Sequence, residues 1–170
     1  MKLKRLLSVL DVCECTADPE LDIRDISFDS RTTQPGDLFA AVCGYESDGH
    51  RFIGAAAERG QRKPEVEIPY ILVADSRLAL SRICCEFFDN PSRELTMIGV
   101  TGTNGKTTVT TLIKHMLEQC LHTKVGLIGT NANVIGDEVL HTEHTTPDAY
   151  ELQKLLRRMV DAGCTHAVME

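Results

Sequence analysis

The order of apolar and polar positions along the chain predicts strands that alternate with helices. In the first half, short apolar runs bounded by turn residues predict strands, and amphipathic stretches predict helices. The expected elements are strands at 24–30, 36–44 and 68–76 and helices at 48–60 and 77–89. The run "IPYILVADS" is typical of a strand buried on both faces. In the helix that follows it, Leu78, Ile83 and Phe87 give an apolar face.

The same cycle restarts after the polar stretch "NPSREL" at residues 90–95. The expected elements are strands at 96–101, 124–130 and 165–170 and helices at 106 to about 120 and at 147–163. Pro147 is placed in the first turn of the last helix and Gly163 just past its end, as helix chemistry prefers. Residues 131–146 are expected to form a polar loop. The alternation predicts an α/β fold whose second half has a mainly parallel sheet.

The stretch at 90–95 also contains the best candidate for a domain boundary. We expect one domain over residues 1–92 and a second over residues 93–170. A parallel sheet that stops at its third strand is small. The second domain is therefore expected to be the beginning of a larger one.

Composition and charge narrow the class of protein. The 170 residues are 42% hydrophobic, which is enough for a core. The formal net charge of −7 argues against nucleic acid or an anionic membrane as the main partner, because nonspecific binding there relies on Lys and Arg. No apolar run approaches the about 20 residues of a membrane span, and the N-terminal run stops at Leu10, too short for a signal sequence. We expect a cytoplasmic protein.

Seven cysteines are scattered without the CxxC spacing of a metal or redox site. They are Cys13, Cys15, Cys43, Cys84, Cys85, Cys120 and Cys164. The groupings "CEC" and "CC" leave a metal or redox interpretation open. We favour reduced cysteines that serve as small apolar side chains, because free cysteine is commonly buried and the cytosol is reducing.

The clearest chemical motif lies in "MIGVTGTNGKTTVTTLIKHML", where a strand, a loop of small residues and a helix follow one another. Backbone N–H groups of such a loop and the helix N-terminus face an anion, and Gly102 and Gly105 let the backbone approach it closely. Lys106 would neutralise phosphate charge, and the Thr107 hydroxyl would bind Mg²⁺. The standard pattern needs glycine where Val100 stands. A glycine-rich turn with an incidental lysine is the alternative, which the strand and helix context disfavours.

The form "TGTNGKTT" resembles the phosphate loop of the Mur ligases and of their relatives, the folylpolyglutamate and cyanophycin synthetases. The stretch "DSRTTQPGDLFAAVCGYESDGHRFI" resembles the N-terminal UDP-binding domain of the Mur ligases that add the last two amino-acid units. The motifs "GLIGT", "HTTPD" and "VME", in this order, resemble the Mur ligases that add the third peptide residue. The resemblance covers the chain from Asp25 onward. A folylpolyglutamate-type ligase would lack the UDP-binding stretch.

The resemblance implies an ATP-dependent amide-bond-forming ligase of peptidoglycan precursor synthesis. ATP phosphorylates the glutamate carboxylate of UDP-N-acetylmuramoyl-L-alanyl-D-glutamate, and the amine of a diamino acid, meso-diaminopimelate or L-lysine, attacks the acyl phosphate. Residues 1–92 would bind the UDP-sugar, and residues 93–170 would form the first part of the ATP-binding domain. Mg²⁺ and lysine would offset the repulsion between the two charged substrates.

The resemblance also assigns the residues of the nucleotide site. The ATP-binding residues would be Gly102, Thr103, Asn104, Gly105, Lys106, Thr107 and Thr108. Lys106, Thr107 and Glu170 would act in catalysis, with Thr107 and Glu170 as ligands of Mg²⁺. Glu170 follows a predicted strand, and ligands of α/β proteins bind at the carboxyl ends of strands. Without the resemblance, a solvated acid would be the favoured interpretation of Glu170.

The UDP-sugar would contact both domains. The matching positions are Phe28, Ser30, Tyr45, Glu46, Ser47, His144, Thr145 and Thr146. An ordinary turn-forming serine remains the alternative for Ser30. The charged residues Asp29, Arg31 and Asp37 are expected to fix loop geometry. His144 stands where many relatives have asparagine, and with His141 it forms HxxH, but no third zinc ligand follows at suitable spacing.

Two departures from the family pattern affect these expectations. After "AAAERG", relatives continue into an apolar strand, whereas this chain reads "QRKPEVE", so a strand is expected to be missing. The family also continues past "ME" with the rest of the ATPase domain and a third domain that selects the diamino acid. We therefore expect the chain alone to be inactive in ligation. A noncatalytic UDP-sugar-binding module is the alternative function.

Overall fold

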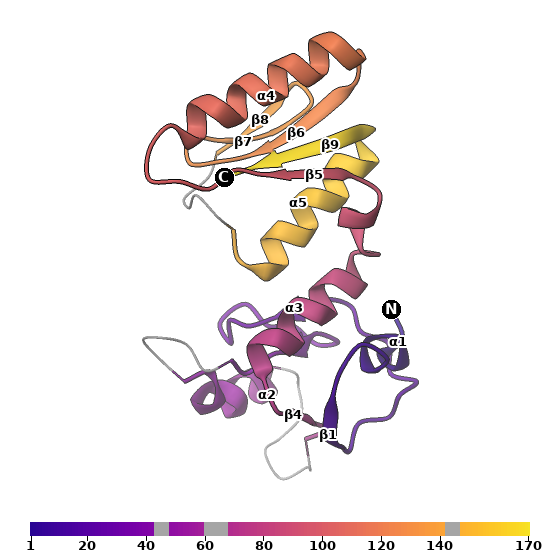
Figure 1. Ribbon diagram of the computed structural model, residues 1–170. Helices are drawn as coiled ribbons and strands as arrows, with labels where there is room; N and C mark the ends of the chain where they lie inside the picture. Colours follow the sequence, from indigo (N-terminus) through magenta and orange to yellow (C-terminus); the bar gives the residue numbers. More distant parts are fainter. Residues whose placement is uncertain (43–47, 60–67, 142–146) are drawn as a thin grey trace. The chain divides into compact units, whose positions relative to one another are not determined.

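The computed structural model describes residues 1–42, 48–59, 68–141 and 147–170. The chain divides into two compact units, Met1–Phe87 and Phe88–Glu170 (Figure 1). In the described part of the chain, every helix is too short or too polar to cross a membrane.

Unit 1 is built from short elements. In chain order they are α1 (Leu3–Leu7), β1 (Val12–Cys15), β2 (Ile26–Ser27), β3 (Leu38–Phe39), the 3₁₀ helix η1 (Gly49–Phe52), α2 (Ile53–Arg59), β4 (Ile71–Val73) and α3 (Ser76–Phe87). Strands β1 and β4 pair antiparallel, and β2 and β3 pair parallel. The helices expected at 48–60 and 77–89 are confirmed within the described residues. Within the described residues, the strands expected at 24–30 and 36–44 are only two residues long each. Strand β2 ends early because the chain enters the turn at Asp29, whose carbonyl accepts from the N–H groups of Thr32 and Thr33.

The strand expected at 68–76 exists as β4, but the prediction that it is buried on both faces was wrong. Ile71 is half-buried and Leu72 is 51% exposed. A strand in a two-stranded antiparallel sheet has too few neighbours to cover two faces. In α3, Ile83 and Cys84 are buried, whereas Leu78 is 47% exposed, so the apolar face lies over the later turns of the helix.

Unit 2 contains one five-stranded sheet and its helices. The elements are the 3₁₀ helix η2 (Pro91–Arg93), β5 (Thr96–Gly99), α4 (Lys106–Leu121), β6 (Lys124–Ile128), β7 (Asn133–Ile135), β8 (Glu138–Leu140), α5 (Ala149–Asp161) and β9 (Cys164–Met169). The strand order is β5-β9-β6-β7-β8. Strands β5, β9 and β6 are parallel, and β7 and β8 continue the sheet antiparallel. The mainly parallel α/β fold is therefore confirmed.

The strand order determines where the two helices lie. The connection from β5 through α4 to β6 steps across β9, and the connection from β6 through α5 to β9 returns in the opposite direction. Because parallel crossovers are right-handed, opposite directions place the two helices on opposite faces of the sheet. Figure 1 shows α4 on one face and α5 on the other.

The hairpin of β7 and β8 corrects the polar loop expected at 131–146. Its strands are joined by Gly136 and Asp137, and Gly136 has a φ of +59°, which glycine adopts without strain. A Gly-Asp pair between two short apolar runs is a signal for a two-residue hairpin. The pattern "NVIGDEVL" thus contained the information that the prediction overlooked.

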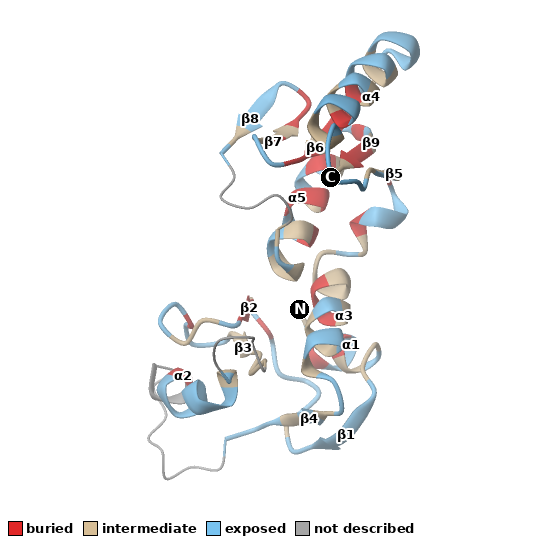
Figure 2. Cartoon of the chain, turned by 60° about the vertical axis from the view of Figure 1, so that its left-hand side comes forward, coloured by how far each residue is buried: buried red, intermediate tan, exposed pale blue. Residues whose placement is uncertain are grey.

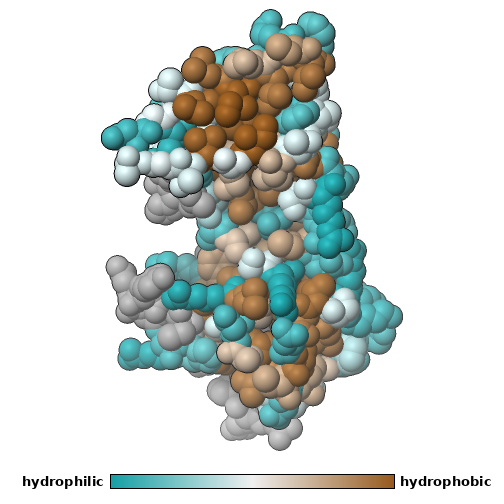
Figure 3. All heavy atoms as spheres, viewed as in Figure 1, coloured by the Kyte–Doolittle hydropathy of each residue, from teal (hydrophilic) through white to brown (hydrophobic). Residues whose placement is uncertain are grey.

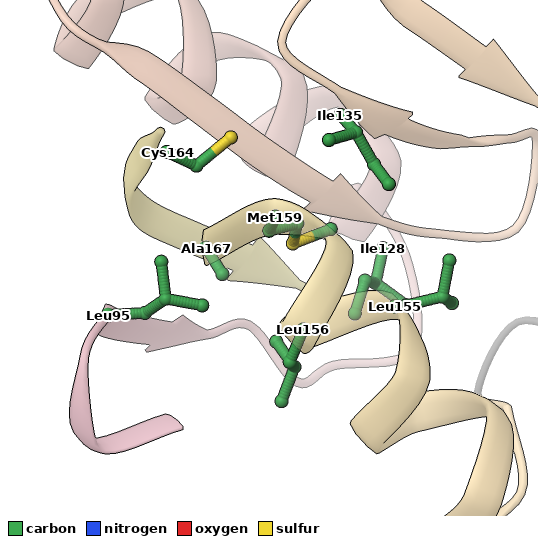
Figure 4. Close-up of a cluster of buried hydrophobic side chains, with 8 residues drawn as sticks. All are labelled: Leu95, Ile128, Ile135, Leu155, Leu156, Met159, Cys164 and Ala167. Atoms are coloured by element: carbon green, nitrogen blue, oxygen red, sulfur yellow. The ribbon is translucent and has the colours of Figure 1, made fainter. Parts of the chain in front are cut away.

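The core of unit 2 lies between the sheet and α5. The cluster consists of Leu95, Ile128, Ile135, Leu155, Leu156, Met159, Cys164 and Ala167 (Figure 4). Met159 is fully buried, and a Cβ at Gly126 of β6 would lie 2.2 Å from its sulfur. Glycine at 126 therefore lets the helix approach the strand this closely. Figure 2 shows buried residues concentrated on the sheet and on α5.

The other helix of unit 2, α4, has an exposed apolar face. Val109, Leu112 and Met116 are 44%, 56% and 64% exposed, and Figure 3 shows apolar side chains gathered on this side of unit 2. The buried residues of α4 are Thr110 and Lys114, and Lys114 pairs with Glu118 one turn later. The buried side of α4 is thus partly polar. The ion pair with Glu118 neutralises the charge of the buried Lys114.

The capping of α5 refines the predicted start of this helix. Asp148 is the N-cap, and its carboxylate accepts a hydrogen bond from the Glu151 N–H at 2.9 Å. Pro147 lies before the cap, so its placement in the first turn was wrong. Gly163 has a φ of +80° just past the end of the helix, which confirms its predicted place.

Replacing Asp148 with alanine should lower the free energy of unfolding of unit 2 by about 1 kcal/mol, because the Glu151 N–H loses its acceptor. Urea unfolding followed by hydrogen exchange of α5 amides measures the change. Asp148→Asn is the control, and it should stay close to the wild type because the amide oxygen still accepts the bond. Equal losses in both variants would show that the negative charge, rather than the cap, stabilises the helix.

Candidate nucleotide site

The loop between β5 and α4 has the backbone of a phosphate-binding turn. Gly102 has a φ of +153° and Gly105 a φ of +80°, both in the region that favours glycine. Gly105 is the N-cap of α4, and this glycine cap supplies no side-chain hydrogen bond to the helix. The first N–H groups of α4 therefore remain directed outward with the positive end of the helix dipole, as an anion requires.

Lys106 closes over this loop. Its ammonium donates to the carbonyl oxygen of Gly102 at 2.9 Å and lies 3.5 Å from that of Thr103. The Lys106 ammonium thus stands beside the N-terminus of α4, where it adds a full positive charge to the partial charge of the helix. Below it, the buried Thr110 hydroxyl donates to the carbonyl oxygens of Lys106 and Thr107 at 3.0 and 3.1 Å. This contact holds the first turn of the helix in place.

Glu170 lies at the same edge of the sheet. It directly follows β9, which is hydrogen-bonded to β5 on one side and to β6 on the other. The Glu170 N–H donates to the Ile128 carbonyl of β6 at 3.0 Å, and the Val100 N–H of the phosphate loop donates to the Met169 carbonyl at 2.8 Å. These two bonds bring the loop and the glutamate together at the carboxyl edge of three parallel strands, the place where α/β proteins bind ligands.

The carboxylate of Glu170 is held by the end of β6. The Thr130 hydroxyl donates to Oε2 at 2.9 Å, and the Thr130 N–H lies 3.4 Å from Oε1. A Cβ at Gly129 would stand 2.6 Å from Oε1. Thr130 and Gly129 were not among the predicted site residues. Their position at the carboxyl end of the strand expected at 124–130 was the signal that could have found them.

The oxygen donors at this edge fit a magnesium ion. Thr107 offers a hydroxyl at the N-terminus of α4, and the half-buried Glu170 offers a carboxylate. Mg²⁺ prefers oxygen ligands, and with a nucleotide it needs only one or two protein carboxylates beside phosphates and water. Within the described ranges, no three His, Cys, Asp or Glu side chains gather as a metal site of their own. His144, the second residue of the HxxH pattern, lies outside those ranges.

In unit 1, the predicted charges do fix the turn after β2. The Asp29 carboxylate accepts from the Arg31 N–H at 2.9 Å and binds its guanidinium at 2.7 Å. The Asp29 carbonyl accepts from the N–H groups of Thr32 and Thr33. Asp37 accepts from the Gln34 N–H at 2.8 Å and pairs with Arg24. The expectation that Asp29, Arg31 and Asp37 fix loop geometry is confirmed.

Phe28 and Ser30 flank Asp29 in this turn. The Phe28 side chain is 42% exposed, and Ser30 is half-buried. Both are presented by the same ordered turn. The other predicted UDP-sugar positions lie outside the described residues; they are Tyr45, Glu46, Ser47, His144, Thr145 and Thr146. Residues 61–67, where a strand was expected to be missing, also lie outside the described residues.

Comparison with known proteins identifies two family matches. The model of the Mur ligase middle domain matches residues 100–170, and that of the Mur ligase family, catalytic domain, matches residues 22–63. Together the matches cover more than half of the chain. They include the phosphate loop, Glu170 and the turn after β2.

Individual relatives agree with these matches. Over 179 residues the chain is 42% identical to UDP-N-acetylmuramoyl-L-alanyl-D-glutamate–2,6-diaminopimelate ligase of Bacteroides fragilis, covering 100% of this chain and 37% of the relative. A solved structure of a ligase with the same name has a TM-score of 0.74 at 24% identity, over 99% of this chain and 35% of the other; this likeness concerns the fold. MurF ligase from Thermotoga maritima, solved in complex with ADP, has a TM-score of 0.53 at 26% identity, over 88% of this chain and 32% of the other. The chain thus spans little more than a third of the length of the curated relatives that it matches.

Proposed function

Because the chain belongs to the Mur ligase family, we propose that it carries the UDP-sugar-binding and first ATP-binding parts of a ligase. This ligase adds 2,6-diaminopimelate to UDP-N-acetylmuramoyl-L-alanyl-D-glutamate. The amino acid is the one named in the relatives. In this proposal residues 1–92 bind the UDP-sugar and residues 93–170 bind ATP, close to the division of the chain into two units after Phe87. The reaction would take place in the cytoplasm, where ATP is available.

One observation carries the proposal. The glycine loop with Lys106 and the carboxylate of Glu170 lie at the same edge of one sheet, joined through the hydrogen bond from Val100 to Met169. A lysine and a helix N-terminus bind phosphate oxygens, and a nearby carboxylate binds the cation that accompanies a nucleoside triphosphate. Each component occurs in many proteins, but their combination on adjacent strands is the arrangement that a phosphoryl-transfer enzyme needs.

The chemistry follows from the poor reactivity of a carboxylate. An oxygen of the substrate carboxylate attacks the γ-phosphorus of ATP, the bond to the β-phosphate oxygen breaks, and ADP leaves with that electron pair. The amine of diaminopimelate then attacks the acyl carbon, phosphate leaves with the C–O electron pair, and the nitrogen loses a proton. Phosphate is a good leaving group, whereas the oxide ion that an unactivated carboxylate would have to release is a very poor one. The product is an amide, with ADP and phosphate as by-products.

Residues of this chain act mainly through charge and position. Lys106 and the first N–H groups of α4 bind the β- and γ-phosphates and stabilise the charge that moves onto ADP. Thr107 and Glu170 would hold Mg²⁺, which when bound supplies positive charge to the phosphate oxygens. Gly102 and Gly105 leave the loop backbone without a side chain at the two positions of positive φ. Thr103 and Asn104 of the loop and Thr108 of the first turn of α4 would complete the site.

Unit 1 would hold the uridine diphosphate end of the other substrate. The exposed ring of Phe28 offers a face for stacking, and Ser30 offers a hydroxyl on a turn that Asp29 and Arg31 keep in shape. Tyr45, Glu46 and Ser47, together with His144, Thr145 and Thr146, remain predicted contacts. Binding of the uridine diphosphate end, far from the reacting carboxylate, would position the substrate before the reaction. Little further entropy would then be lost at the chemical step.

Two calorimetric titrations of the purified protein test this proposal. UDP-N-acetylmuramoyl-L-alanyl-D-glutamate and a non-hydrolysable ATP analogue with Mg²⁺ should each bind at one site, and nucleotide binding should weaken when EDTA removes the metal. Binding of the UDP-sugar without any binding of the ATP analogue would contradict a ligase role. It would favour a noncatalytic UDP-sugar-binding module. Binding of neither would overturn the proposal as a whole.

A further inference from the structure

We propose that Thr130 is a positioning residue that holds the carboxylate of Glu170 ready to bind Mg²⁺ on the nucleotide. This inference rests on the proposed function, because it assigns Glu170 to the metal. It adds Thr130, the last residue of the motif "GLIGT", which was not among the predicted site residues. The role is indirect, since Thr130 acts through the glutamate rather than through the substrate.

The first support is the set of contacts at the carboxylate. The Thr130 hydroxyl donates to Oε2 at 2.9 Å, and the Thr130 N–H lies 3.4 Å from Oε1. Both oxygens are therefore approached by one residue, from the end of the neighbouring strand. A glutamate side chain has three rotatable bonds, and a hydrogen bond to a fixed partner selects one of its rotamers.

The second support is the backbone around the contact. Glu170 is tied by its N–H to the Ile128 carbonyl at 3.0 Å, so its Cα is fixed relative to β6. Gly129 lies between Ile128 and Thr130, and a Cβ there would stand 2.6 Å from Oε1 and 3.3 Å from Cδ of Glu170. The carboxylate thus lies against the short backbone segment formed by Ile128, Gly129 and Thr130.

The third support is that Thr130 does not serve the core. It is exposed and is the second residue past the end of β6. Loss of its methyl group or hydroxyl should therefore leave the packing of unit 2 unchanged. Since each carboxylate oxygen has two lone pairs, the bond from Thr130 leaves acceptor sites on both oxygens for a cation. Partners of this kind usually change metal affinity 10–100-fold when they are removed.

The test compares Thr130→Val with Thr130→Ser in the purified protein. Valine keeps the shape and removes the hydroxyl, and serine keeps the hydroxyl. The probe is Mn²⁺, whose binding to the complex with a non-hydrolysable ATP analogue is measured by electron paramagnetic resonance. Thr130→Val should bind Mn²⁺ about 10–100-fold more weakly, and Thr130→Ser should stay close to the wild type. Nucleotide binding in EDTA and the thermal unfolding temperature should be the same in all three proteins.

Gly129→Ala provides a second variant that reaches the same carboxylate by a different route. Its methyl group should displace Oε1 and weaken Mn²⁺ binding even though Thr130 is intact. Equal Mn²⁺ affinity in the wild type and Thr130→Val would overturn the positioning role while leaving the proposed function in place. A wild type that binds the nucleotide analogue without any dependence on Mn²⁺ would overturn the assignment of Glu170 to the metal, and this inference with it.

Discussion

In the ligase of which we propose that this chain forms part, replacing Lys106 with methionine should lower the rate of ATP-dependent amide formation about 100- to 1000-fold, the usual loss when one preorganised donor to a developing charge is removed. Methionine keeps the aliphatic stem of the lysine but carries no charge. The ammonium that stands 2.9 Å from the Gly102 carbonyl beside the N-terminus of α4 would be gone. The rate of ADP formation in the presence of both other substrates measures the loss.

Two controls separate charge at this position from charge in general. Lys106→Arg keeps a cation and should retain more activity than Lys106→Met, although the longer planar group fits a point-charge role poorly. Lys154→Ala removes a lysine from the exposed side of α5, where it pairs with Glu151, and should leave the rate unchanged. Lys106→Met with an unchanged rate would show that the loop does not bind the reacting phosphate.

Replacing Met159 with alanine should lower the free energy of unfolding of unit 2 by about 2–5 kcal/mol, as for other large-to-small changes in cores. Met159 is fully buried at the centre of the cluster between α5 and the sheet. The change removes apolar contacts and leaves a cavity that the surrounding strands cannot fill by moving. Native-state hydrogen exchange of the β6 and β9 amides reports this loss for unit 2 alone.

Gly126 supplies the matched control, because it faces Met159 at short distance. Gly126→Ala alone should destabilise unit 2 by about 1–3 kcal/mol through overpacking. In the double variant the new methyl group would occupy space that the methionine has left, so the combined loss should be smaller than the sum of the two single losses. Additive losses would mean that the two residues do not share this space.

Apart from the hairpin of β7 and β8, the second half of the fold was predictable because its elements carry strong local signals. Strand β5 ends and α4 begins at the phosphate loop. The long amphipathic pattern of α5 ends shortly before Gly163. The first half was less predictable, because strands of two or three residues such as β2, β3 and β4 depend on their partners more than on their own sequence. The burial of β4 was wrong for this reason.

The candidate site shows the same division. Gly102, Gly105, Lys106 and Thr107 are close in sequence, so one motif was enough to find them. Thr130 and Glu170 are 40 residues apart, and their contact exists only because β6 and β9 are neighbours in the sheet. A pairing of strands that are distant in sequence cannot be read from hydrophobic periodicity, since periodicity reports which face is buried but not which strand lies alongside.

The place of β9 in the sheet has a consequence for the order of folding. This strand is the last element of unit 2 in sequence, yet it lies between β5 and β6, and Thr96 of β5 is in register with His166. As the chain leaves the ribosome, β5, α4, β6 and α5 all appear before the strand that joins them. The hydrogen bonds that β9 makes to β5 and β6 can therefore form only after α5 has been synthesised, and contacts between residues so far apart in sequence make folding slow. During that interval the edges of β5 and β6 that face each other lack their hydrogen-bonding partner, and unpaired strand edges of this kind are prone to aggregation.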